Sequence, residues 1–166
     1  MKVYLIGMPG SGKTTLGRQV ASELLCEFVD LDQEIEKREQ QSIAEIFNRR
    51  GEDYFRTLES TTLREWAAST LPFVMATGGG TPCYNGGIEV INQTGFSIFL
   101  DVTVDNLLRR LEHKSNRPLL AAPDKEGLKN KLDVLRQSRL PFYKQAHVTL
   151  KSPTVAALME KIHFRR

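Results

Sequence analysis

A run of eight residues near the N-terminus has the composition and spacing of a phosphate-binding loop. Residues 7–14 read Gly-Met-Pro-Gly-Ser-Gly-Lys-Thr, a complete G-x-x-x-x-G-K-[ST] pattern directly after the apolar run Val3–Ile6. In such a loop the glycines let backbone N–H groups face a phosphate, Lys13 offers a cation, and Thr14 offers a hydroxyl to Mg²⁺. A helix that begins near Lys13 adds its positive dipole to the same site. The pattern predicts nucleoside triphosphate binding, and the alternative is a glycine-rich turn without a ligand.

Two carboxylates follow at the end of the next apolar segment, in the sequence Phe-Val-Asp-Leu-Asp of residues 28–32. If that end is extended, Asp30 and Asp32 point the same way, and in an open α/β sheet they face the ligand crevice. One of them could hold Mg²⁺ through water, and the other could accept a proton from a substrate hydroxyl. The alternative is that one of them caps a helix N-terminus.

Three further motifs combine arginine or glycine with apolar residues. Arg56 stands among apolar neighbours on a predicted helix, where it either reaches a ligand or lies along the surface. Gly78, Gly79 and Gly80 end a predicted strand and either admit a ligand close to the backbone or form a plain turn. Arg117 and Arg139 occur later in the chain. With the phosphate-binding loop, these arginines suggest positive charge around a triphosphate and an acidic second substrate.

Strand and helix patterns alternate along the chain and predict how these motifs are held. Short apolar strands are expected at Val3–Ile6, Glu27–Asp30, Pro72–Ala76, Phe96–Leu100 and His147–Leu150. Helices are expected at Lys13–Leu25, at 31–68 with interruptions at 40–42 and Gly51, and at Thr103–Glu112, Lys125–Tyr143 and Thr154–Ile162. The segment His113–Asp124 has no hydrophobic periodicity and is expected to be a loop. The alternation predicts an α/β fold with a five-stranded parallel sheet covered on both faces.

Length and composition predict one ordinary globular domain. The chain has 166 residues, of which 40% are hydrophobic and 26% charged, and its 23 basic and 20 acidic side chains leave a net charge of +3. That excess is too small to indicate nucleic acid binding. Cys26 and Cys83 are isolated and are expected to be reduced thiols, and the three histidines have no ligand-like spacing. We find no signal peptide or membrane-length apolar run and expect a soluble, cytoplasmic protein.

The order and spacing of these motifs across nearly the whole chain resemble the shikimate kinase family. The resemblance rests on the phosphate-binding loop, Asp-Leu-Asp at 30–32, Ser-Ile-Ala-Glu-Ile-Phe at 42–47, Gly51-Glu52 with Phe55-Arg56 and Glu59, the glycine triplet, Arg-Pro-Leu-Leu at 117–120, and Arg139-x-Pro141-x-Tyr143. It implies a three-layer α/β sandwich of the phosphate-loop NTP hydrolase, NMP-kinase-like type, formed by residues 1–166 as a single domain. It further implies a shikimate-binding helical region at about 31–60 and a lid at about 112–124.

For the nucleotide side, the resemblance implies ATP as co-substrate and Mg²⁺ as cofactor. Thr14 would ligate Mg²⁺ and Asp30 would help place it through water. Arg110 would lie against adenine, and Arg117 would swing in with the lid as a catalytic residue beside Lys13. The implied ATP-binding residues are Gly10, Ser11, Gly12, Lys13, Thr14, Thr15, Arg110 and Arg117.

For the acceptor side, the resemblance implies transfer of the γ-phosphoryl of ATP to the 3-hydroxyl of shikimate, a step of aromatic amino acid biosynthesis. Asp32 would hold the ring hydroxyls and orient or deprotonate the attacking one. Glu59 would fix two arginines that grip the substrate carboxylate. The implied shikimate-binding residues are Asp32, Arg56, Gly78, Gly79, Gly80 and Arg139. We expect a monomer without nucleic acid or membrane partners.

The chain departs from the family pattern between His147 and Thr154, where it lacks the longer polar loop that many members place beside adenine. We expect residues 151–153, Lys-Ser-Pro, to take that place with fewer contacts. Two alternatives stay open. One is a phosphate-loop kinase of gluconate or a nucleoside monophosphate, which would not need paired arginines for a carboxylate. The other is a nucleotide-binding regulatory module without catalysis, although Lys13, Asp32 and Arg117 are all present.

Overall fold

The computed structural model describes residues 1–112 and 124–165. Its strands are β1 (Lys2–Ile6), β2 (Glu27–Asp30), β3 (Phe73–Ala76), β4 (Phe96–Leu100) and β5 (Val148–Leu150). Its helices are α1 (Lys13–Leu24), α2 (Leu31–Glu39), α3 (Ile43–Ala68), α4 (Gly87–Thr94), α5 (Val104–Leu111), α6 (Lys125–Tyr143) and α7 (Val155–His163), with a 3₁₀ turn, η1, at Thr81–Cys83. The loop predicted for residues 113–124, with Arg117, lies outside the described residues except for Asp124.

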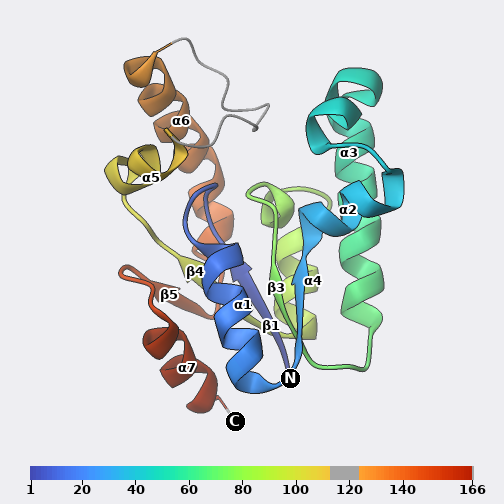
Figure 1. Cartoon of the computed structure of the whole chain (residues 1–166), viewed down its shortest axis with the longest axis vertical. Coiled ribbons are helices and arrows are strands. Elements are labelled where there is room, and N and C mark those ends of the chain that lie inside the picture. The colour runs from blue at the N-terminus through green and yellow to red at the C-terminus, as the bar shows by residue number, and fades with distance from the viewer. Residues whose placement is uncertain (113–123, 166) are drawn as a thin grey trace.

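The strands form one parallel sheet in the order β2-β3-β1-β4-β5. The order places the first strand in the middle, with β3 and β4 on either side (Figure 1). Because the strands are parallel, the segments after β1, β2 and β3 leave the sheet at the same edge. These segments are the phosphate-binding loop, the Asp30–Asp32 pair and the glycine triplet. The topology therefore brings three of the sequence motifs together.

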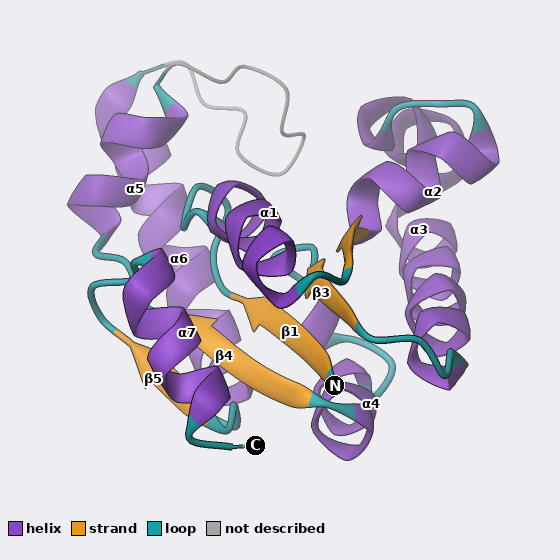
Figure 2. Ribbon diagram, turned by 60° about the horizontal axis from the view of Figure 1, so that its bottom comes forward, coloured by secondary structure: helices purple, strands orange, loops and turns teal. Residues whose placement is uncertain are grey.

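Helices cover both faces of the sheet, and the side chains of β1 alternate between the two cores. Val3 and Leu5 pack with α1 and α7 on one face. Tyr4 and Ile6 belong to the larger core on the other face, which includes residues of α3, α4 and α6. Figure 2 shows α1 and α7 on one side of the strands and α4 on the other. The α/β fold with a doubly covered, five-stranded parallel sheet is confirmed.

The predicted elements agree with the structure except in a few places. The helical stretch from 31 to 68 is interrupted where expected: α2 ends before Gln40, and Gly51 has φ 83°, which kinks α3. The helix α3 begins with a capping box formed by Ser42 and Glu45. We did not predict η1 or α4, because the sequence Asn-Gly-Gly at 85–87 indicates a turn and the apolar run that follows is short. None of the described helices is long and apolar enough to cross a membrane.

A cluster of side chains joins β4 to the start of β5. The Ser97 hydroxyl donates to Oδ1 of Asn92 at 2.6 Å and accepts the backbone N–H of His147 at 3.0 Å. Nδ1 of His147 in turn accepts the backbone N–H of Ser97 at 3.2 Å. Partial burial and the nearby Arg165 lower the pKa of His147 from its usual value of 6.5. The neutral imidazole is therefore the form that fits the folded state.

This arrangement predicts a pH dependence of stability. Because the folded state lowers the pKa of His147, the unfolded chain binds the proton more readily, and stability falls as the pH drops below 6.5. We expect the difference in free energy of unfolding between the wild type and His147→Asn, which keeps a hydrogen-bond acceptor, to shrink between pH 7.5 and 5.5. Urea unfolding at both pH values measures it. A difference that stays constant or grows on acidification would contradict this role of His147.

Candidate active site

The phosphate-binding loop folds around the side chain of Lys13. This side chain is only 8% exposed, and its ammonium donates to the carbonyls of Gly7 at 2.8 Å and Met8 at 2.9 Å. Gly12, with φ 96°, precedes the first residue of α1 and has no side chain to cap it. The first backbone N–H groups of the helix are thus available to an anion, as the loop motif requires.

Thr14 and Asp30 link α1 to the end of β2. The Thr14 hydroxyl donates to Oδ2 of Asp30 at 2.8 Å, while Oδ1 of Asp30 accepts the backbone N–H of Gln33 at 3.2 Å. One carboxylate oxygen therefore caps α2 and the other turns toward the phosphate-binding loop. The two interpretations of Asp30 from the sequence, cap and site residue, are compatible.

Asp32 reaches the same place from a different element than we expected. The strand β2 ends at Asp30, so Asp32 lies in the first turn of α2 and not on an extended strand end. A Cβ built on Gly78 would lie 3.0 Å from Oδ1 of Asp32, which shows how close the carboxylate comes to the glycine triplet. Both aspartates face one cavity of about 480 Å³, which is lined by Gly10, Gly12, Lys13, Thr14, Thr15, Leu16, Asp30, Asp32, Thr77, Gly78, Gly79, Arg110 and Pro153.

Arg56 is buried in α3 and is not a surface side chain. Its residue exposure is 5%, and its guanidinium donates to Oε1 of Glu59 at 3.0 Å and to Oε1 of Glu52 at 3.3 Å. The second carboxylate oxygen of Glu59 accepts the Thr81 hydroxyl at 2.8 Å. Tyr84 covers the guanidinium, with its ring centroid 4.0 Å from Cζ of Arg56. The arginine is thus held in one orientation from three sides.

The glycine triplet packs against both arginines. A Cβ on Gly80 would overlap the guanidinium of Arg56, and one on Gly79 would lie 2.7 Å from Nη1 of Arg139. Arg139, on α6, is 5% exposed like Arg56. Only residues without a Cβ allow the two guanidinium groups to come this close to the backbone. A plain flexible turn does not explain this packing.

Burial and charge act in opposite directions in this cluster. Desolvation is the largest single effect and lowers the pKa of Arg56, but the charge and hydrogen bond of Glu59, together with Tyr84 and Glu52, outweigh it, so the pKa is raised and the cation is retained. Burial raises the pKa of the Cys83 thiol to about 11, against the opposing effect of the two arginines. Neither Cys26 nor Cys83 belongs to a disulfide, and both are half-buried. The thiol beside the arginines is therefore neutral, and the cluster carries its positive charge on Arg56 and Arg139.

Arg110 and Pro153, both expected near adenine, also line the cavity. Arg110, on α5, donates to the carbonyl of Gly10 at 3.0 Å. Pro153 belongs to the short segment expected beside adenine, and it lines the cavity. Ser11, Arg56, Gly80 and Arg139 do not line this cavity; the last three lie next to it through the glycine triplet.

Four residues at the site have contacts to which the sequence analysis assigned no role. They are Leu16, Thr81, Tyr84 and Tyr143. Thr81 and Tyr84 follow the glycine triplet closely in sequence, and Tyr143 stands one helical turn after Arg139. Spacing could have indicated Tyr143, since residues four apart share a helix face. No sequence signal distinguishes Tyr84 from an ordinary surface aromatic.

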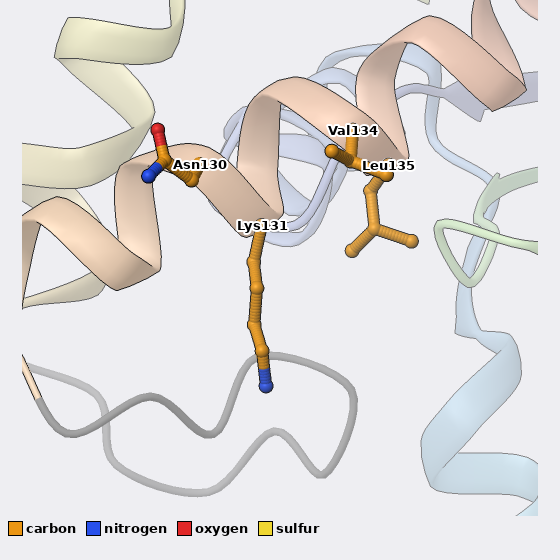
Figure 3. Close-up of a pocket in the computed structure, with 4 residues that line it drawn as sticks. All are labelled: Asn130, Lys131, Val134 and Leu135. Carbon is orange, nitrogen blue, oxygen red and sulfur yellow. The ribbon is translucent and has the colours of Figure 1, made fainter.

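A second hollow lies on the surface of α6 and holds none of the predicted site residues. It measures about 280 Å³ and is lined by Asn130, Lys131, Val134 and Leu135. Figure 3 shows these four side chains along one stretch of the helix. One lysine and one amide beside two aliphatic side chains do not form a catalytic constellation.

A phosphate-binding loop and two carboxylates line one cavity, and a pair of buried arginines lies next to it. These features are typical of a phosphotransferase that acts on a small molecule. Comparison with known proteins narrows the class. The shikimate kinase family model matches residues 9–163, and the chain belongs to this family of ATP-dependent kinases.

Relatives in sequence and structure agree with this family. The chain is 43% identical to the shikimate kinase of Phocaeicola vulgatus over 152 residues, which cover 91% of this chain and 86% of that protein. The crystal structure of shikimate kinase from Bacteroides thetaiotaomicron has a TM-score of 0.91 and 36% identity, covering 98% of both chains. A shikimate kinase from Acinetobacter baumannii, solved in complex with shikimate, has a TM-score of 0.88 and 36% identity, covering 98% of this chain and 90% of that one.

The ion pair at the centre of the arginine cluster predicts an effect on stability. Glu59→Gln removes the charge that compensates buried Arg56, so we expect a loss of about 3 kcal/mol in the free energy of unfolding. Glu52→Gln is the matched control, because the Glu52 side chain is 42% exposed and contacts the same arginine. The control should lose less than about 1 kcal/mol. Equal losses in the two variants, measured by urea unfolding, would refute the central role of Glu59.

Proposed function

We propose that this chain transfers the γ-phosphoryl group of ATP to the 3-hydroxyl of shikimate, giving shikimate 3-phosphate and ADP. Shikimate is a small carboxylic acid that carries ring hydroxyls, and the site has a group suited to each part. The observation that carries the proposal is the buried pair Arg56 and Arg139 beside the glycine triplet, next to Asp32. An acceptor without a carboxylate would have no use for this pair.

The acceptor side would work by orientation and proton acceptance. A guanidinium presents two parallel N–H groups to a planar carboxylate, so Arg56 and Arg139 can fix both the position and the rotation of the acid. The attacking hydroxyl would then lie near Asp32, whose carboxylate accepts its proton as the bond to phosphorus forms. Phosphoryl transfer asks mainly for such alignment and for charge neutralisation.

The donor side would bind the triphosphate at the loop between β1 and α1. Lys13 would move from the Gly7 and Met8 carbonyls to the β- and γ-phosphates. The Thr14 hydroxyl and the Asp30 carboxylate, 2.8 Å apart, are hard oxygen ligands of the kind Mg²⁺ prefers, and they fit a cation held directly by Thr14 and through water by Asp30. Bound there, Mg²⁺ supplies positive charge to the transferring phosphate oxygens.

The remaining assignments follow from the family resemblance. We infer that residues 1–166 act as one kinase domain, with the shikimate-binding part at about 31–60. Arg117 and the lid at about 112–124, largely outside the described residues, are assigned to closure over the triphosphate, and Arg110 to adenine. We further infer a cytoplasmic monomer that needs neither nucleic acid nor a membrane.

A coupled ADP-release assay tests the proposal directly. The purified chain is given ATP, Mg²⁺ and one of three acceptors: shikimate, gluconate or AMP. We expect turnover with shikimate alone. AMP has no carboxylate for the two arginines, and gluconate has one but, as an open chain, does not hold its hydroxyls in a fixed ring position relative to Asp32. Faster ADP release with gluconate or AMP than with shikimate would overturn the proposed function.

Asp32 should be needed for turnover and dispensable for nucleotide binding. Asp32→Asn keeps the size of the side chain but removes its charge, and we expect kcat to fall at least about 100-fold, as for loss of a general base. The affinity for ADP, measured by calorimetry, should not change. Asp133→Asn, an exposed aspartate on α6, serves as control and should behave as wild type. Loss of ADP affinity in Asp32→Asn would contradict the assignment to the acceptor.

Arg139 should act on shikimate and not on ATP. Arg139→Lys keeps the positive charge but not the two parallel donors, so we expect the KM for shikimate to rise about 10- to 100-fold. The KM for ATP should stay within twofold. The control is Arg38→Lys, since Arg38, on α2, contacts Thr62 and Glu65 of α3 and takes no part in the arginine cluster. An unchanged shikimate KM in Arg139→Lys would remove this residue from the acceptor site.

A further inference from the structure

Tyr143 is a fully buried phenol that the proposed reaction does not use. It is the last residue of α6, its exposure is 0%, and its ring packs on Phe99 with the centroids 5.0 Å apart. Its hydroxyl donates to the carbonyl of Gly79 at 2.6 Å. The sulfur of Met8, in the phosphate-binding loop, lies 3.8 Å from the same oxygen. One hydroxyl therefore touches two of the segments that build the site.

The same hydroxyl also faces Arg139. The two residues are four apart on α6 and share a face of the helix, and both meet Gly79: the Tyr143 hydroxyl bonds to its carbonyl, and Nη1 of Arg139 lies 2.7 Å from the place of a Cβ on it. The positive charge of Arg139 also acts on the phenol. A phenol has one hydrogen, which goes to Gly79, and its lone pairs are left to accept from Arg139. Burial raises the pKa of Tyr143, so it stays a neutral donor throughout the range in which enzymes work.

We propose that Tyr143 is a positioning residue that sets the distance between the Arg139 guanidinium and the glycine triplet, and so aims one of the two forks at the acceptor carboxylate. This inference rests on the proposed function and adds a residue to it. Tyr143 does not line the cavity and acts only through Arg139 and the Gly79 carbonyl. In this proposal the hydroxyl oxygen of Tyr143 lies between the Arg139 guanidinium and the Gly79 carbonyl and fixes the position of both.

The Tyr143 hydroxyl would give buried Arg139 a hydrogen-bond acceptor that carries no charge. Arg139 is 5% exposed, so its N–H groups need acceptors inside the protein when no carboxylate is bound. Arg56 has Glu59 and Glu52 for this purpose. The Tyr143 oxygen is a neutral acceptor for Arg139, and it leaves the charge of that arginine for the substrate. A carboxylate at the same place would compete with the acid that the site binds.

Tyr143→Phe tests the proposal, and Tyr4→Phe is its matched control. Both tyrosines are 0% exposed, and the Tyr4 hydroxyl bonds to Thr94 at 2.9 Å, away from the cavity. For Tyr143→Phe we expect the shikimate KM to rise about tenfold, because that is the loss of affinity expected when a hydrogen bond to a charged group is removed. The ATP KM should stay within twofold of the wild-type value, and kcat within threefold. Tyr4→Phe should lower the melting temperature without changing either KM.

A second measurement reads binding without turnover. Shikimate at a fixed concentration should raise the melting temperature of the wild type and of Tyr4→Phe, and should do so less for Tyr143→Phe. In the double variant with Arg139→Lys, the Tyr143→Phe change should add less than twofold to the shikimate KM, because its effect passes through Arg139.

The outcomes separate this inference from the proposed function. If the wild type neither turns over shikimate nor is stabilised by it, the proposed function fails. If the wild type does both, a shikimate KM for Tyr143→Phe within twofold of wild type overturns the positioning role. An equal rise of both KM values overturns it too. So does a Tyr143→Phe chain that fails to fold while Tyr4→Phe folds, because the hydroxyl would then serve stability alone.

Discussion

This site depends on one constraint. Two guanidinium groups are almost completely buried, and both pack against the backbone of glycine residues. Removing a cation from water costs several kcal/mol, and Arg56 and Arg139 are both 5% exposed. The buried Glu59 offsets part of that cost, which leaves the buried members of the cluster with more positive than negative charge. A bound acid would supply the missing negative charge. The glycine triplet is necessary because any Cβ at Gly79 or Gly80 would push a guanidinium away.

The parallel sheet places the glycine triplet and its two arginines beside the phosphate-binding loop, which allows one site to bind two substrates. The strands β2, β3 and β1 are neighbours, so Asp30 and Asp32, the glycine triplet and the phosphate-binding loop meet at one edge although they are far apart in sequence. The helices α3 and α6 bring one arginine each from opposite sides of the triplet. Figure 1 shows α3 and α6 on either side of the strands that end at this edge. Arg56 and Arg139 are far apart in sequence and come together at the glycine triplet only through the tertiary fold.

Much of this arrangement could be predicted from the sequence, and the exceptions have physical causes. The phosphate-binding loop and the five strands follow local rules of composition and period, which need no knowledge of distant residues. The burial of Arg56 could not be predicted, because an arginine among apolar residues is compatible with a surface position until Glu59, Thr81 and Tyr84 are seen around it. The helix α4 was missed because its eight residues begin with Gly87 after a turn signal. Asp32 lies on a helix because Asp30 caps it, which ends the strand two residues early.

Preorganisation differs between the two halves of the site. In the proposed acceptor half, the hydrogen bonds from Arg56 to Glu59, from Thr81 to Glu59 and from Tyr143 to Gly79 are formed by the protein alone, so binding of an acid there would need little reorganisation. In the proposed donor half, Lys13 is bonded to carbonyls of its own loop, and a triphosphate bound there would exchange these bonds for bonds to phosphate oxygens. Met8 belongs to that loop and also contacts the Tyr143 hydroxyl. A rearrangement of this loop around a bound triphosphate would therefore reach Tyr143, the residue proposed to position Arg139. The side chain of Tyr143 thus connects the two proposed half-sites through direct contacts.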